Sequence, residues 1–128
     1  MAQTGSTIRE YTTRAQSTGT FGRVLCSARD QHLVADGPAQ NGCPGEAITP
    51  AELFLSGVAA CGVELIQVLA REDNVPLQSI SATIHGQMDR AAPVRPDVTL
   101  FNQVRILFEL TGVSEEQGHT LVDRFTKR

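Results

Sequence analysis

Several features that commonly identify a function are absent or scarce in this 128-residue sequence. The eleven basic residues form no run and alternate with fourteen acidic ones, so nucleic-acid binding has little support. The three cysteines, Cys26, Cys43 and Cys61, are odd in number and widely spaced, which argues against a disulfide scaffold and a zinc knuckle. The three histidines have no metal-ligand spacing with one another or with a cysteine, so the sequence indicates no metal and no other cofactor.

The chain contains no linker that demands a second domain, so we expect a single domain over residues 1–128. Hydrophobic residues make up 41% of the sequence and charged residues 20%, as in a soluble globular protein. The N-terminal segment lacks the apolar core and the cleavage site of a signal peptide, which makes a cytoplasmic location the default expectation.

The most informative segment is TPAELFLSGVAACGVELIQVLAR, at residues 49–71. Thr49 and Glu52 fit the two ends of a capping box and Pro50 fits the first helical position, so we expect a helix to begin here. Apolar residues cover nearly every side of its helical wheel, which predicts burial all round. The helix is about as long as a membrane span, but Glu52 and Glu64 would be expensive in hydrocarbon, so we interpret it as a protein core.

The other predicted elements are short. Five segments have the composition or alternation of strands: residues 7–14, 21–27, 31–36, 80–88 and 104–110. We expect a hairpin turn at residues 28–30, an irregular Gly- and Pro-rich loop at 37–45 and a hairpin loop at 89–97. A second capping box at residues 114–117 predicts a short final helix. The order β-β-β-α-β-β-α groups the strands, which favours an α+β fold over a parallel α/β sheet.

A long helix that is apolar on every side needs cover on every side. Five short strands from one chain could hardly surround it, so a partner chain is the economical source of cover. We therefore expect an obligate homodimer.

One stripe of the long helix is small or polar. Its members fall at three- and four-residue spacings and are Gly57, Ala60, Cys61, Glu64 and Gln67. A thiol in such a stripe is a candidate nucleophile, although a free cysteine in an apolar helix is more often an inert small hydrophobe.

The Gly/Pro-rich loop, the segment PAELFLSGVAAC at residues 50–61 and the two alternating strands together resemble the OsmC/Ohr family, the osmotically inducible and organic hydroperoxide resistance proteins. The resemblance runs from about Phe21 to the end and is most specific where Pro50 and Cys61 have the family's separation. It implies an OsmC-like fold, an intertwined homodimer in which antiparallel β-sheets wrap two long central helices. It also implies a peroxidase of oxidative stress defence, in which an organic hydroperoxide oxidises Cys61 to a sulfenic acid. A second cysteine of the family then closes a disulfide, which dithiol reductants of the lipoyl type reopen.

The sequence departs from the family's pattern in three places. The family's catalytic glutamate immediately follows the proline, where this chain has Ala51, and the nearest acid is Glu52, about 100° further around the helix. The family's activating arginine aligns with Thr20, which leaves Arg23 as the nearest guanidinium. Family members carry the second cysteine shortly after a segment like residues 123–128, where this sequence stops. Either the sequence is truncated or the helix thiol is regenerated differently.

Peroxide reduction needs a thiolate, and Cys61 lies too deep in its helix for the N-terminal dipole to favour that form much. Glu64, one turn further on, is a like charge, so an arginine has to bridge or screen the pair, with Arg23 and Arg14 as candidates. Glu52 is a candidate acid that the capping box also explains without any chemistry. The candidate catalytic residues are thus Cys61, Glu52, Glu64 and Arg23.

The other two cysteines have simpler interpretations. Cys43 lies in a loop and could form a disulfide with Cys61 if that loop folds over the helix, but a surface thiol of no consequence is the simpler interpretation. Cys26 is most simply a packing residue in a strand. The competing function is a non-catalytic member of the same fold that binds a small apolar or thiol-reactive ligand. The missing glutamate and arginine favour that second function, whereas Cys61 favours the peroxidase.

Overall fold

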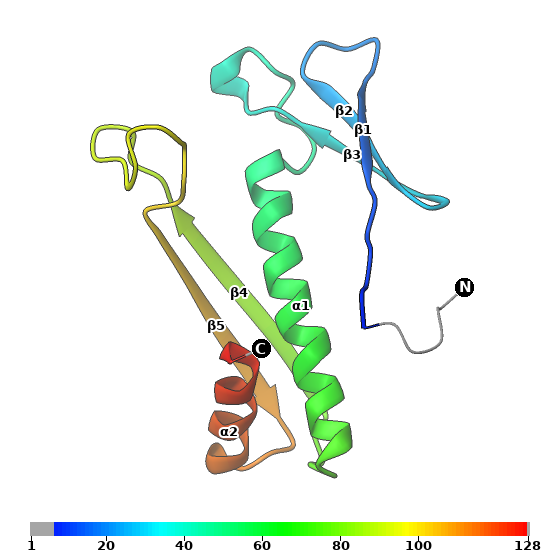
Figure 1. Ribbon diagram of the computed structural model, residues 1–128, viewed down its shortest axis with the longest axis vertical. Coiled ribbons are helices and arrows are strands. Elements are labelled where there is room, and N and C mark those ends of the chain that lie inside the picture. The colour runs from blue at the N-terminus through cyan, green and yellow to red at the C-terminus, as the bar shows by residue number, and fades with distance from the viewer. Residues whose placement is uncertain (1–6, 128) are drawn as a thin grey trace. The chain divides into compact units, whose positions relative to one another are not determined.

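The computed structural model describes residues 7–127, and Figure 1 draws their helices and strands. In chain order these are β1 (Arg14–Ser17), β2 (Arg23–Ala28), β3 (Gln31–Asp36), the short 3-10 helix η1 (Ala39–Asn41), α1 (Pro50–Glu72), β4 (Ser79–Gln87), β5 (Gln103–Thr111) and α2 (Glu115–Thr126). Every strand pair is antiparallel, so the predicted α+β class and the order of elements are confirmed. The chain forms two compact units, Met1–Leu53 and Phe54–Arg128, and the single domain over residues 1–128 stays a prediction.

The N-terminal unit contains a three-stranded sheet in the order β1-β2-β3. The predicted hairpin is confirmed, because β2 and β3 pair from Ala28 opposite Gln31 around a turn in which Arg29 has φ of 55°. The strand predicted at residues 7–14 is wrong in position, since β1 begins only at Arg14. Arg14 pairs with Ser27 near the end of β2, and the chain turns at Arg29 just after that strand. The residues before Arg14 therefore have no strand to pair with.

The C-terminal unit packs α2 and the β4–β5 hairpin against α1 (Figure 1). The two strands pair in register from Ser79 opposite Thr111 to Gln87 opposite Gln103, which confirms the predicted second pair. Four buried residues form the centre of the core: Ile66, Leu69 and Ala70 of α1 and Leu121 of α2. The second capping box is also confirmed, because the Ser114 hydroxyl accepts a hydrogen bond from the Gln117 amide and the Gln117 side chain accepts one from the Ser114 amide.

The aromatic rings of this core meet α1 at a glycine. Phe108 of β5 and Phe125 of α2 pack edge to face with ring centroids 5.7 Å apart. A Cβ atom placed on Gly62 would lie 2.8 Å from Phe108 Cζ and 3.2 Å from Phe125 Cζ. The absence of a side chain at Gly62 therefore lets the aromatic pair approach the helix.

The single chain buries only part of α1, as expected if a partner chain supplies the rest of its cover, and burial all round stays a prediction. The buried residues of α1 are Gly62, Ile66, Leu69 and Ala70, all in the C-terminal half, while Phe54 is 63% and Val58 40% exposed. The reason is that the core of the C-terminal unit covers α1 only on one side and only near its end. By length and composition alone α1 could cross a membrane, but the acidic side chains along it favour a core helix.

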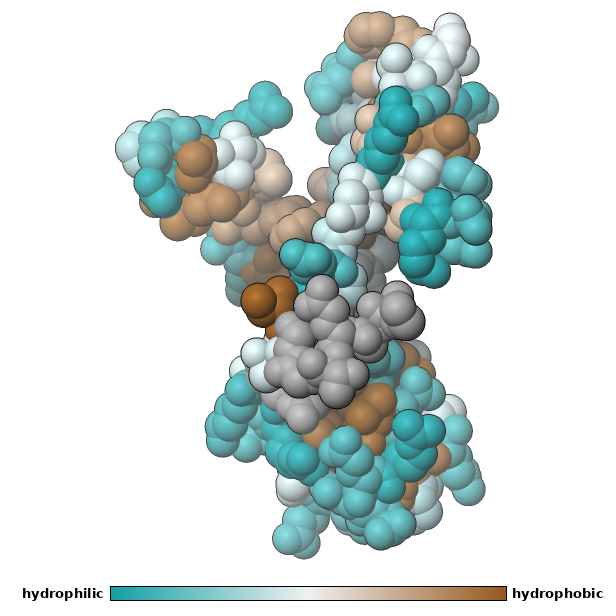
Figure 2. All heavy atoms as spheres, turned by 45° about the vertical axis from the view of Figure 1, so that its right-hand side comes forward, coloured by the Kyte–Doolittle hydropathy of each residue, from teal (hydrophilic) through white to brown (hydrophobic). Residues whose placement is uncertain are grey.

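Apolar side chains are also exposed in the loop between β4 and β5, where brown atoms gather at the upper left of Figure 2. Val94 is 56%, Val98 44% and Leu100 45% exposed in this loop. The loop has an internal anchor, because the Asn102 side chain accepts a hydrogen bond from the Asp89 amide and donates one to the Ala92 carbonyl. The predicted hairpin loop is thus confirmed as a longer, locally ordered connection.

Candidate functional site

The start of α1 carries the first candidate residue, Glu52. The Thr49 amide donates a hydrogen bond to Glu52 Oε1 at 2.9 Å, and the Glu52 amide donates one to Thr49 Oγ1 at 3.3 Å, so the predicted capping box is confirmed. The bond from the Thr49 amide, with a second from the Thr49 hydroxyl, lowers the pKa of Glu52. The Glu52 carboxylate is therefore ionised and used in the helix cap.

The second and third candidates, Cys61 and Glu64, lie on one face of α1, three residues apart. The small and polar stripe predicted for this helix is exposed along its whole length: Gly57, Ala60, Cys61, Glu64 and Gln67. Within residues 7–127, neither the Cys61 thiol nor the Glu64 carboxylate makes a side-chain hydrogen bond or an ion pair. The single chain thus presents Cys61 as an accessible thiol next to a carboxylate.

The fourth candidate, Arg23, belongs to a charge cluster that sequence reasoning missed. Arg23 Nε donates to Asp36 Oδ1 and Arg23 Nη2 to Asp36 Oδ2, both at 2.8 Å, and Nη2 also donates to Glu46 Oε1 at 2.9 Å. The Asp36 side chain is fully buried, whereas that of Glu46 is 76% exposed. The hydrogen bonds from Arg23 hold the pKa of Asp36 well below its usual range, and the same bonds raise the pKa of Arg23.

Asp36 also holds the chain segment that leads into α1. Its Oδ2 accepts the backbone amides of Glu46 at 3.0 Å and Ala47 at 2.9 Å, and its own amide donates to the Ile48 carbonyl at 3.0 Å. Thr49, the N-cap of α1, comes next in the chain. One buried carboxylate therefore joins β2, β3 and the start of the helix.

A signal for the Arg23–Asp36 pair was present in the sequence. With a two-residue turn at residues 29 and 30, antiparallel pairing of β2 with β3 places Arg23 opposite Asp36. Asp36 is the last residue of the strand predicted at residues 31–36, and Gly37-Pro38 after it is typical of a turn, so no local pattern indicates a partner for its carboxylate. Burial of that carboxylate depends on residues 46–48 folding back over it, which the local sequence does not indicate.

Cys43 is not the surface thiol of the sequence-based interpretation. It is half-buried, and a Cβ atom placed on either Gly22 or Gly37 would lie 2.4 Å from its Sγ atom. Gly22 also has φ of 80°, which other residues rarely adopt. The thiol therefore fills a gap between two glycines, and its loop is packed at this point.

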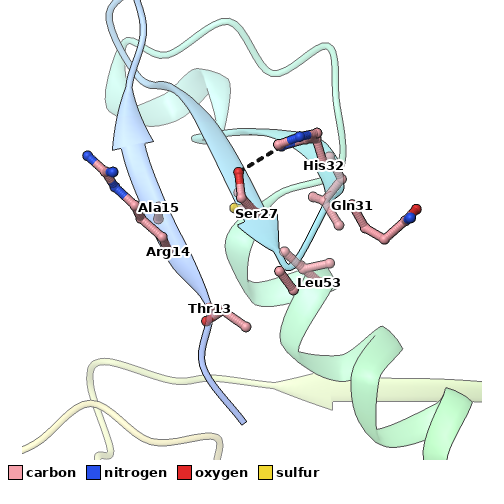
Figure 3. A pocket seen from close by; sticks show the side chains of 10 residues that line it. Thr13, Arg14, Ala15, Ser27, Gln31, His32 and Leu53 are labelled. Carbon is pink, nitrogen blue, oxygen red and sulfur yellow. Dashed lines mark hydrogen bonds between the residues drawn. The ribbon is translucent and has the colours of Figure 1, made fainter. Parts of the chain in front are cut away.

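A cavity of about 270 Å³ opens on the N-terminal unit (Figure 3). Its lining is mostly apolar and includes Cys26, Leu33 and Leu53, together with Arg14 and the hydrogen-bonded pair Ser27 Oγ and His32 Nδ1, which are 2.8 Å apart. Cys26 is half-buried, in agreement with its interpretation as a packing residue. In the part of the chain that the structure describes, no group of three or more His, Cys, Asp or Glu side chains is placed to hold a metal.

Comparisons with known proteins identify the family of this chain. The family model described as OsmC-like protein matches residues 43–128, which is more than half of the chain. The chain belongs to the OsmC-like protein family. Cys61, Glu52 and Glu64 lie inside the matched region of this OsmC-like protein, while Arg23 and Asp36 precede it. A comparison with curated proteins finds no match.

Solved structures show that the protein has the OsmC fold. An OsmC-like protein from Mycoplasma pneumoniae matches with a TM-score of 0.80 and 16% identity, over 94% of this chain and 82% of the other. An organic hydroperoxide resistance protein OsmC from Legionella pneumophila matches with a TM-score of 0.71 and 24% identity, over 95% and 85%. A putative organic hydroperoxide resistance protein from Vibrio cholerae, with captopril bound in one of its active sites, matches with a TM-score of 0.62 and 25% identity, over 98% and 83%. The OsmC-like fold of the chain is thus confirmed, while the intertwined homodimer stays a prediction.

Proposed function

We propose that this OsmC-like protein is a thiol-dependent peroxidase that reduces organic hydroperoxides through Cys61. The observation that carries the proposal is the position of Cys61, an exposed thiol in the polar stripe of α1 and inside the region matched by the family. The Legionella and Vibrio proteins of the same fold are described as organic hydroperoxide resistance proteins, which supports the same substrate class here.

The reaction begins when the Cys61 thiolate attacks one oxygen atom of the hydroperoxide. The O–O bond breaks, Cys61 gains that oxygen as a sulfenic acid, and the other oxygen leaves with a proton as the alcohol. A thiol then attacks the sulfenic sulfur, releases water and forms a disulfide. A second thiol reduces this disulfide and restores Cys61.

We propose an external dithiol of the lipoyl type as the source of both reducing thiols. Cys43 is a poor candidate for a resolving cysteine, because its sulfur is packed between Gly22 and Gly37 and has to leave that position to react. An external dithiol supplies the two electrons without moving the loop.

Activation of the thiol needs a cation that offsets Glu64. Arg23 is our candidate in the proposal, and its Nη1 nitrogen is the part of the guanidinium that makes no hydrogen bond within residues 7–127. The carboxylate of Glu52 is committed to the helix cap, so in this proposal it acts on the start of α1 and not as a proton acceptor.

We further propose a cytoplasmic homodimer. The exposed apolar side chains of Phe54 and Val58 lie on α1 within two turns of Cys61, and a second copy of the chain would cover them. Such cover would also enclose the thiol in an apolar environment suited to an organic hydroperoxide.

One observation favours the alternative, a non-catalytic protein that binds a small apolar or thiol-reactive ligand. Ala51 and Thr20 replace the acid and the guanidinium of the family pattern, and the nearest substitutes, Glu52 and Arg23, already have partners in the structure. A protein with this arrangement would keep the Cys61 thiol but would not reduce hydroperoxides rapidly.

Intact-mass analysis separates the two functions. After one equivalent of cumene hydroperoxide, the peroxidase proposal expects a gain of one oxygen atom on Cys61, which dimedone traps as a sulfenic acid. Cys26→Ser and Cys43→Ser are matched controls and should keep the adduct, while Cys61→Ser should lose it. An unmodified wild-type protein, or an adduct that persists in Cys61→Ser, would refute the peroxidase proposal.

A further inference from the structure

The Arg23 guanidinium has two edges, and the structure uses them differently. The edge formed by Nε and Nη2 binds both oxygens of Asp36 at 2.8 Å, in the bidentate geometry that arginine prefers with carboxylates. The Asp36 side chain is fully buried and also accepts two backbone amides, so this edge is occupied by a well-fixed partner.

The edge formed by Nη1 and Nη2 carries a single hydrogen bond, from Nη2 to Glu46 Oε1 at 2.9 Å. Glu46 is 76% exposed, and its carboxylate binds Arg23 through one oxygen only. An exposed ion pair of this kind contributes little to stability, so Glu46 can be displaced at small cost. A carboxylate that reached Nη1 and Nη2 together would make one hydrogen bond more than Glu46 makes.

Arg23 also borders a groove that contains an exposed aromatic residue. Arg23 lines an open groove along the β1–β2 hairpin, together with the polar residues Thr18 and Thr20 and the apolar residues Phe21 and Val24. Phe21 is 78% exposed in the described structure, so its ring is available for an apolar group. A cationic residue and an exposed aromatic residue thus border the same groove.

We propose that Arg23 is the centre of a binding site for a small carboxylate that carries a short alkyl or aryl group, and that Glu46 is the internal occupant of this site. The ligand carboxylate takes the Nη1–Nη2 edge, Glu46 turns into solvent, and the apolar group lies against Phe21. Asp36 keeps the guanidinium oriented throughout. The site does not depend on any reaction at Cys61.

The test uses sodium hexanoate as the probe and the Cys61→Ser protein as the host, so that binding is measured without thiol chemistry. Hexanoate binding is followed by NMR through the Nε–H resonance of Arg23. Glu46→Gln removes the internal competitor for Arg23. Because exposed ion pairs contribute about 0.2–1 kcal/mol, this variant should bind hexanoate about two- to fivefold more tightly than the host protein. Glu116→Gln, at an exposed position of α2, removes the same charge elsewhere and should leave the affinity unchanged.

Two further measurements identify the contact. Hexanol, which lacks the carboxylate, should not shift the Arg23 resonance, and higher salt should weaken hexanoate binding. Arg23→Lys keeps the charge beside Asp36 but removes the bidentate edge, so the folded variant should lose most of the affinity. Equal affinity in wild type and Glu46→Gln, or equal tightening by Glu116→Gln, would overturn the proposal even if Arg23→Lys failed to fold.

Discussion

Two glycines of α1 should respond in opposite ways to the same substitution. Gly57 and Gly62 both lie in the interior of the helix, and replacing either by alanine should gain about 1 kcal/mol of helix propensity. A Cβ atom on Gly57 would meet nothing within 4 Å, whereas one on Gly62 would lie 2.8 Å from Phe108 Cζ and 3.0 Å from Phe108 Cε1. Gly57→Ala should therefore stabilise the chain, while Gly62→Ala should force the aromatic ring to shift.

The magnitude follows from the difference between the two variants. Since the propensity gain is common to both, it cancels, and the difference between their free energies of unfolding reports the cost of overpacking. That cost is typically about 1–3 kcal/mol. The free energies are measured by urea unfolding, with far-UV circular dichroism as the signal and equal protein concentration throughout, because association would shift the apparent stability.

A third variant tests the cause. Phe108→Leu removes the ring that the new Cβ atom meets, so Gly62→Ala should cost less in the Phe108→Leu background than in wild type. Cys61 reactivity should change little in Gly62→Ala, because Gly62 is buried and Cys61 is exposed. If Gly62→Ala proved as stable as Gly57→Ala, the close approach of Phe108 to the helix would be refuted.

Three more predictions follow from the charges and from the exposed face of α1. The pKa of Asp36 lies below its ordinary value of 3.8, so the ionised carboxylate stabilises the protein above about pH 4, and this contribution is lost as the pH falls further. The melting temperature of Asp36→Asn should therefore depend less on pH in the acid range than that of wild type. An equal dependence of the two melting temperatures on pH below about pH 4 would contradict this role of Asp36. If wild type is the proposed homodimer, Val58→Asp should sediment as a monomer, and a dimeric variant would place the interface elsewhere. The double variant Ala51→Glu with Thr20→Arg should oxidise Cys61 up to about 100-fold faster than wild type in stopped-flow measurements, and the gain should exceed the sum of the two single variants' gains in activation free energy. If wild type already reacts as fast as the double variant, other residues activate the thiol.

Local rules made several parts of this protein predictable from sequence alone. Each capping box joins residues three apart in the chain, so Thr49 with Glu52 and Ser114 with Gln117 could be identified without any tertiary information. The period-2 alternation of β4 and β5 likewise depends only on neighbouring residues. The resemblance around Cys61 is carried by one continuous segment, and the family comparison bears it out.

Tertiary structure alone decided which side chains these elements bring together. The strand expected at residues 7–14 could not persist where β2 offers no partner, although its composition suits a strand. Asp36 is buried because residues 46–48 fold over it, and Cys43 is packed because Gly22 and Gly37 leave room for its sulfur. In each case the deciding contact joins residues that are distant in the chain, and chain entropy makes such contacts depend on the whole fold instead of on any local pattern.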